Sequence, residues 1–331
     1  MKGHIIPQVY QKKWHTKNGS NNVYYFEKNN LKNPINKSGG NVKNSMCEVD
    51  EYILTETDKL NGVKYNDPYD LENFFCNEYE NKWNDILNNS LLNDFLNRIA
   101  PIEGNVNYAV KKEDIEDTPF ESNLLNYVIL QYFRIYKNFK ELNSENEVAK
   151  KIISTKKSLY GQETDIKINV TELSKLLNNE TYMRSIWKQL LLDCKEQNLN
   201  HSNLLCVREI IKECNLTFIF LKEELNSRFI LSDNPVIWNC KIIKDFKDLD
   251  SGIYFAIHPN IMIAYLKYPE NIELQQGDAL CLFGNDDFVK YMNYLLWVQS
   301  KEKVGFMNTD IASNIDKNVD FKTSWNKLFI H

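Results

Sequence analysis

The stretch Leu216-Thr217-Phe218-Ile219-Phe220-Leu221 decides the fold class, because the hydrophobic period of the chain changes there. Short runs rich in aromatic and β-branched residues begin at this point, separated by turn residues, which is typical of β-strands. The runs cover residues 216–221, 229–231, 236–238, 253–257, 261–266 and 279–283. The pattern then predicts a helix over residues 286–300 and a last strand over residues 304–307.

The residues before this stretch are predicted to be mainly helical. Asp67-Pro68 supplies an N-cap residue followed by a proline at the first helical position. Apolar residues then repeat at helical spacing over residues 69–88, and again over residues 120–142. Further helices are expected at residues 145–160, 170–177, 181–194 and 204–213.

The N-terminal part combines helix and strand signals. Apolar residues have helical spacing over residues 5–14, whereas Val23-Tyr24-Tyr25-Phe26 predicts a strand and residues 47–55 a second one. Strands at both ends favour an α+β fold, in which one sheet of N- and C-terminal strands packs on a helical middle region. The corresponding segments are 1–66, 67–215 and 216–331, which we expect to form one compact unit.

The composition limits the classes of function. The 331-residue chain has a formal net charge of -5 at pH 7, which argues against wide nonspecific DNA binding but not against a local basic groove. Its 7 cysteines are scattered and form no Cys-x-x-Cys pair, as expected for reduced thiols. The N-terminus lacks the apolar part of a signal peptide, and no apolar run reaches the roughly 18 residues of a membrane-spanning helix. We therefore expect a cytoplasmic protein with no membrane partner.

Familiar catalytic motifs do not occur in the sequence. A glycine-rich phosphate loop, a dinucleotide fingerprint, a serine-hydrolase elbow and a zinc-protease motif are all missing. His4 and His15 are the nearest pair among the 5 histidines. On one continuous helix they would lie about 16 Å apart, which is too far to chelate one metal ion.

His4 opens the first of two local patterns that could carry chemistry. It precedes Pro7, Tyr10 and Trp14. One interpretation is structural, with a proline-started helix that docks its aromatic residues into the core. The other uses His4 as a general acid or base, because imidazole titrates near neutral pH.

Ser232-Asp233-Asn234-Pro235 forms the second pattern, between two predicted strands. Asp and Asn in such a turn can bond to their own backbone while Pro fixes φ, which is ordinary turn chemistry. A carboxylate at the end of a strand is also rigidly positioned, as functional groups need to be. The sequence leaves both interpretations open.

In this order, the segments resemble domain-of-unknown-function family 4238, over most of the chain. Members open with His-x-x-Pro-x-x-Tyr/Phe and later carry a helical Glu, a Gln-x-x-Arg helix, a Ser-Asp-Asn-Pro turn, a His-Pro or Thr-Pro step and a helical Asn. The matching positions here are His4, Pro7, Tyr10, Trp14, residues 23–28, Glu80, Gln131, Arg134, Ser232–Pro235, His258-Pro259 and Asn293.

The match departs from the family pattern after Arg134. Members often have Thr-Pro there, whereas this chain has Ile135-Tyr136. Glu78 is an alternative to Glu80 as the matching acid. The resemblance implies a fold and a set of residues to test, but no activity.

Our first functional hypothesis is a nuclease, or phosphodiester hydrolase. Its role as an effector in bacterial defence or as a toxin is an expectation from the family resemblance and not from the residues. Nucleic acid is then the partner, and a divalent cation such as Mg²⁺, bound by oxygen ligands, is the expected cofactor. The expected catalytic residues are His4, Asp233 and Glu80, and the expected substrate-binding residues are Gln131, Arg134 and Asn234.

The second hypothesis is a non-catalytic binding or sensor module that recognises a protein partner of a defence system. Arg134 lies on a strongly apolar helix, and an unpaired buried charge costs several kcal/mol, so it needs a partner. Glu80 or Asp233 would serve. In this view the same polar residues hold the ends of the chain onto the helical region.

Overall fold

The largest sheet collects strands from the C-terminal part and one from the middle of the chain. In the computed structural model, residues 2–4, 6–15, 22–35, 40–41, 46–49, 51–81, 108–111, 120–144, 179–196, 214–239, 252–266 and 278–319 are described. The strand order is β5-β11-β6-β10-β9-β8. The pair β11 and β6 is parallel, and every other pair of neighbouring strands is antiparallel. The bounds are β5 (Tyr108–Lys111), β6 (Asn215–Phe220), β8 (Val236–Asn239), β9 (Gly252–His258), β10 (Ile261–Leu266) and β11 (Asp278–Phe283).

Two smaller sheets contain the N-terminal strands. A four-stranded sheet has the order β3-β2-β12-β7, so strands from both ends of the chain pair in it. A two-stranded sheet joins β1 to β4, with His4 opposite Cys47. The bounds are β1 (Lys2–His4), β2 (Asn22–Glu27), β3 (Gly40–Asn41), β4 (Cys47–Val49), β7 (Leu231–Ser232) and β12 (Lys303–Phe306).

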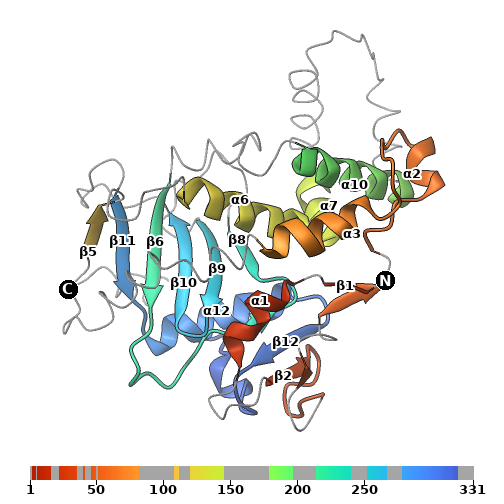
Figure 1. Cartoon of the computed structure of the whole chain (residues 1–331). Coiled ribbons are helices and arrows are strands. Elements are labelled where there is room, and N and C mark those ends of the chain that lie inside the picture. The colour runs from red at the N-terminus through yellow and green to blue at the C-terminus, as the bar shows by residue number, and fades with distance from the viewer. Residues whose placement is uncertain are drawn as a thin grey trace.

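The helices of the middle region gather beside the large sheet (Figure 1). There α6 runs over the sheet, and α10 contacts α2, α3 and α7. Another helix, α12, contacts β7 and β8. The bounds are α1 (Gln8–Gln11), η1 (Lys12–Trp14), α2 (Glu56–Leu60), α3 (Asp70–Asn73), the π-helical η3 (Phe74–Tyr79), α6 (Phe120–Phe133), α7 (Tyr136–Ser144), α10 (Glu180–Glu196), α12 (Asp286–Gln299) and η5 (Ala312–Asn314).

Aromatic side chains dock the N-terminal helical turns onto the large sheet. The Tyr10 hydroxyl donates to the carbonyl of Ala256 (2.6 Å), and its ring stacks on Phe255 at 5.0 Å between centroids. Trp14 is fully buried and its Nε1 donates to the carbonyl of Phe229 (2.8 Å). Each large ring thus buries its apolar area while its polar atom is satisfied. The structural interpretation of the first pattern accounts for Tyr10 and Trp14.

The α+β class predicted from the sequence is confirmed, and the four-stranded sheet combines N- and C-terminal strands as predicted, but the described strands form three sheets and not one. Among the N-terminal strands, β2 pairs with β3 and β12, and β1 pairs with β4, so none of them joins the large sheet, whose edge strand β5 comes from the middle region. Local periodicity reports which residues form strands, but not which strands pair. The expected helices at 145–160, 170–177 and 204–213 lie outside the described residues.

Two long helices predicted from periodicity are interrupted. The predicted helix over residues 69–88 begins as α3 and continues as a π-helical turn from Phe74 to Tyr79. The predicted helix over residues 120–142 is divided into α6 and α7 by Arg134 and Ile135. Both interruptions lie where polar residues of the candidate site meet.

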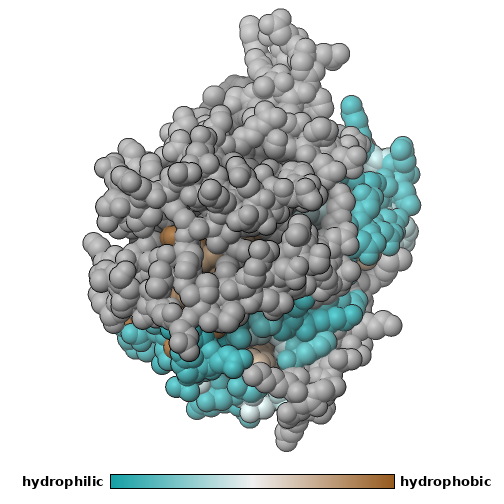
Figure 2. Space-filling view, turned by 60° about the vertical axis from the view of Figure 1, so that its left-hand side comes forward, coloured by the Kyte–Doolittle hydropathy of each residue, from teal (hydrophilic) through white to brown (hydrophobic). Residues whose placement is uncertain are grey.

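The large hydrophobic residues that are exposed in the described part of the chain are Ile35, Leu60, Tyr69 and Val298. On the face shown in Figure 2, hydrophilic residues dominate the described part, and hydrophobic areas are small. Within the described ranges, none of the helices combines the length and the apolar character that crossing a bilayer requires.

Candidate functional site

The break between α6 and α7 is the centre of the candidate site. Carbonyl groups that a continuous helix would use internally accept hydrogen bonds here from side chains of other elements. The carbonyl of Tyr132 accepts from Asn138 Nδ2 (3.0 Å). The carbonyl of Phe133 accepts from Trp187 Nε1 (2.7 Å), and that of Arg134 accepts from the Tyr52 hydroxyl (3.3 Å). Donors from three parts of the chain therefore meet at this point.

Arg134 lies inside an aromatic cage and is only 1% exposed. Its Nε donates to the Tyr52 hydroxyl oxygen (3.1 Å). Its guanidinium carbon lies 4.2 Å from the ring centroid of Phe75, 5.2 Å from that of Tyr52 and 5.5 Å from that of Tyr79. A desolvated guanidinium gains cation–π stabilisation from such rings.

Acidic residues of the helix over residues 70–81 border this cage. Glu72, Cys76 and Glu80 are four residues apart, with Glu72 buried, Glu80 half-buried and Cys76 exposed. Burial raises the pKa of the Cys76 thiol, the charges of Glu80 and Glu72 add to this, and the charge of Arg134 lowers it. These four residues are therefore electrostatic neighbours.

Glu80 joins this group to the start of α1. Burial raises the pKa of its carboxyl above the ordinary value, while the charges of Arg134 and Lys12 and a hydrogen bond from the backbone N–H of Gln8 oppose the rise. Burial wins, so Glu80 binds its proton more tightly than a solvated glutamate.

The shifted pKa of Glu80 predicts a pH-dependent effect of Glu80→Gln. Since the folded protein holds this proton more tightly than the unfolded chain, the contribution of Glu80 to stability is present below pH 4.5 and is lost as pH rises through the raised pKa. The amide of the variant cannot ionise. The melting temperature of the variant, relative to the wild type, should therefore rise between about pH 4 and pH 8. Parallel melting curves across this range would contradict the assignment.

Gln131 lies one turn before Arg134 and is also 1% exposed. The Tyr79 hydroxyl lies 3.2 Å from its Oε1 and 3.0 Å from the carbonyl of Tyr127. Because Tyr79 directly precedes Glu80, this contact fixes the end of the helix over residues 70–81 against α6.

The residues of the Ser-Asp-Asn-Pro turn bind to other segments. Asp233 is 5% exposed, and its carboxylate accepts hydrogen bonds from the backbone N–H groups of Lys301 (2.7 Å), Glu302 (2.8 Å) and Lys303 (2.8 Å). Burial raises the pKa of Asp233, although these three N–H groups oppose the rise. The carboxylate thus faces the loop that leads into β12.

Asn234 connects this turn to the α6–α7 break. Its amide pairs reciprocally with the amide of Asn138, at 2.8 and 2.9 Å, and its Nδ2 also donates to the carbonyl of Gln299 (3.2 Å). Asn138 also donates to the carbonyl of Tyr132, so it links Asn234 to the break that contains Arg134.

Two other residues from the family pattern stabilise turns. Burial lowers the pKa of His258 to about 4, in the same direction as the charge of Lys13, and its Nδ1 accepts the N–H of Asn260 (3.1 Å). Asn293 is fully buried, and its amide bonds to the backbone of Ile230, Arg228 and Asn314 at 2.8–2.9 Å. The neutral imidazole of His258 and the fully hydrogen-bonded amide of Asn293 therefore have structural roles.

The structure thus brings Glu80, Gln131 and Arg134 together, with Asn234 reaching them through Asn138. Asp233 is directed to the backbone of residues 301–303 instead. The backbone of His4 lies in β1, but its side chain lies outside the described part of the structure.

Residues missed from the sequence are Tyr52, Glu72, Asn138 and Trp187. On the continuous helix predicted over residues 120–142, Asn138 would share a face with Gln131 and Arg134, and that spacing was a usable signal, whereas in the structure Asn138 lies in α7, beyond the break. Tyr52 and Trp187 look like ordinary core residues in the sequence. In the described ranges, no cluster of three or more His, Cys, Asp or Glu side chains is arranged to bind a metal ion.

Comparison with known proteins identifies one family. Residues 2–310 match the family described as "Protein of unknown function (DUF4238)". No curated protein and no solved structure matches the chain significantly.

Proposed function

The chain belongs to the DUF4238 family, and from the surroundings of Glu80 we propose that it is a hydrolase that cleaves phosphodiester bonds in nucleic acid. The observation that carries the proposal is the half-buried Glu80 carboxyl, whose pKa is raised by burial beside the buried charge of Arg134. A carboxyl group that stays protonated closer to neutral pH is suited to general acid catalysis.

In the proposed reaction, Glu80 donates its proton to the leaving oxygen while water attacks phosphorus. The oxygen of the water forms the new bond to phosphorus while the bond to the leaving oxygen breaks. His4 accepts the proton that the water loses, a role that we assign from the sequence pattern alone. Lys12 is exposed and close enough to Glu80 to affect its charge, so it is available to bind the phosphate. Arg134 is too deeply buried to reach a polymer, and its role in the proposal is to act on the Glu80 carboxyl through its positive charge.

Replacement of Glu80 by glutamine tests the proposal. The purified chain is incubated with single- and double-stranded RNA and DNA, with Mg²⁺, Mn²⁺ or a chelator. We expect cleavage by the wild type and a loss of about 10²–10⁴-fold in Glu80→Gln, because the general acid is removed. Glu78→Gln is the matched control, since Glu78 is exposed on the same helix. Equal activity of Glu80→Gln and wild type, or no wild-type cleavage, contradicts the proposal.

A different observation favours the second candidate, a module that binds a protein partner without catalysis. Arg134 and Gln131 are 1% exposed and Asp233 is 5% exposed, so most of the polar residues are used inside the protein. Such residues fix the shape of a surface without reacting. Absence of cleavage under every condition, in a wild-type chain that is folded and stable, supports this candidate over the hydrolase.

A further inference from the structure

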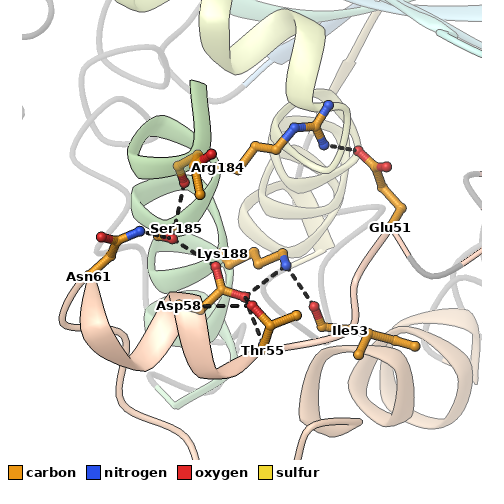
Figure 3. A network of polar contacts seen from close by, with 9 residues as sticks. Glu51, Ile53, Thr55, Asp58, Asn61, Arg184, Ser185 and Lys188 are labelled. Carbon is orange, nitrogen blue, oxygen red and sulfur yellow. Dashed lines mark hydrogen bonds and ion pairs between the residues drawn. The ribbon is translucent and has the colours of Figure 1, made fainter. Parts of the chain in front are cut away.

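A buried ionic network joins α10 to the segment over residues 51–61 (Figure 3). Lys188 is 8% exposed and Asp58 is 3% exposed, and their charged groups lie 2.9 Å apart. Asp58 also accepts a hydrogen bond from the Ser185 hydroxyl (2.7 Å) and two from Thr55, at 2.8 and 2.9 Å. The carboxylate therefore has enough partners to remain ionised inside the protein.

The same helix also holds the two residues that flank Tyr52. Lys188 Nζ donates to the carbonyl of Ile53 (2.6 Å), and Arg184 donates to the carboxylate of Glu51 (2.9 Å). Both contacts are visible in Figure 3, on the side of the network away from Ser185. The Lys188 ammonium has three N–H donors. One of them binds Asp58, and another binds the carbonyl of Ile53 and so restrains the backbone there.

Tyr52 in turn holds Arg134. Its hydroxyl oxygen accepts from Arg134 Nε (3.1 Å) and the hydroxyl donates to the Arg134 carbonyl (3.3 Å), so one phenol group links the side chain and backbone of the same residue. Trp187, the neighbour of Lys188, donates to the carbonyl of Phe133 (2.7 Å). Helix α10 therefore restrains Tyr52 on both sides and the residue before Arg134.

We propose that Lys188 is a positioning residue, which acts through Ile53 and Tyr52 to hold the guanidinium of Arg134 beneath Glu80 and Cys76. The inference goes beyond the proposed hydrolase, because the chain of contacts is the same whether or not the site is catalytic. It assigns to α10, which supplies none of the polar residues predicted from the sequence, control over the electrostatics of the candidate site.

The thiol of Cys76 provides a reporter of the position of Arg134. It is exposed, and the positive charge of Arg134 lowers its pKa against the opposing effects of burial, Glu80 and Glu72. If the guanidinium moves away, the thiolate fraction falls at a given pH and alkylation slows. Mass spectrometry of the labelled peptide follows Cys76 alone, whatever the other cysteines do.

The experiment compares Asp58→Asn with the double variant Asp58→Asn/Lys188→Met. The single variant retains the bond from Lys188 to Ile53, whereas the double variant removes it without leaving a charge buried. We expect alkylation of Cys76 near pH 8 to slow by about threefold or more in the double variant, equivalent to a pKa rise of roughly half a unit. In the single variant the alkylation rate of Cys76 should remain close to that of the wild type, although the buried Lys188 ammonium, left without a counter-charge, lowers the stability of this variant.

Tyr52→Phe provides the second arm, because it removes only the hydroxyl. It should slow alkylation to a similar extent, and adding Lys188→Met and Asp58→Asn should slow it little further, since both changes act through one contact. Circular dichroism establishes that each variant is folded. An unchanged Cys76 profile in folded Tyr52→Phe overturns the proposal, as does an additive effect of the combined changes. If the double variant does not fold, the profile of Tyr52→Phe decides alone.

Discussion

Replacement of Asp58 by alanine is expected to lower the free energy of unfolding by about 3–5 kcal/mol, because it leaves the Lys188 ammonium buried with no counter-charge. Lys188 is only 8% exposed. The same change removes one acceptor of the Ser185 hydroxyl, which also bonds to the carbonyl of Thr181, and the capping box that starts α2, where Thr55 and Asp58 bond to each other reciprocally. Loss of the charge partner is the dominant effect.

Glu56→Ala is the matched control for this prediction. Glu56 lies in the same helix and pairs with Lys59 at 2.9 Å, but its side chain is 83% exposed. An ion pair in water contributes about 0–1 kcal/mol. Chemical denaturation with urea measures both variants, and similar losses in the two would show that the Asp58–Lys188 pair is not the strong contact that its burial indicates.

The sequence was informative wherever local periodicity decides structure. The strands β6, β9, β10 and β11 and the helix α12 lie where apolar spacing predicted them. The breaks in the long helices carried no such signal, because neither Gly nor Pro marks Arg134-Ile135. The break depends on donors that lie far away in the sequence, such as Tyr52 and Trp187.

In the candidate site, too, the sequence indicated some residues but not their contacts. Glu80, Gln131 and Arg134 were predicted together from a family resemblance, and they are neighbours in the structure. The partners of Asp233 were not foreseen, because they are backbone N–H groups. Every residue except proline has such a group, so no sequence pattern identifies the three that bind Asp233.

Asp233→Ala is expected to destabilise the fold by about 3–5 kcal/mol, which lowers the melting temperature by roughly 5–10 °C. The carboxylate accepts the N–H groups of Lys301, Glu302 and Lys303, and alanine leaves all three without their acceptor. Hydrogen bonds to a charged group contribute more than neutral ones, and the penalty grows because the site is buried.

Asp233→Asn separates charge from shape at the same position. The amide retains one oxygen but turns an NH₂ group toward backbone donors, so it should recover little stability. Glu302→Gln is the control, since it keeps the backbone contact and removes only a negative charge that raises the pKa of Asp233. Thermal unfolding should rank the melting temperatures as Glu302→Gln near wild type, then Asp233→Asn, then Asp233→Ala. Wild-type melting of Asp233→Ala would mean that the three contacts do not hold this loop.

The reason for a large effect lies in what the loop joins. Residues 301–303 follow the C-cap of α12 and lead into β12, which pairs with β2 and β7. The neighbouring Ser232 hydroxyl donates to the carbonyl of Leu296 (3.1 Å), and Asn234 Nδ2 donates to that of Gln299, so the same turn also caps the C-terminal end of α12. Releasing the loop therefore loosens a helix end and a central strand of the four-stranded sheet together. For this reason we expect Asp233→Ala to lower the cooperativity of unfolding as well as the melting temperature.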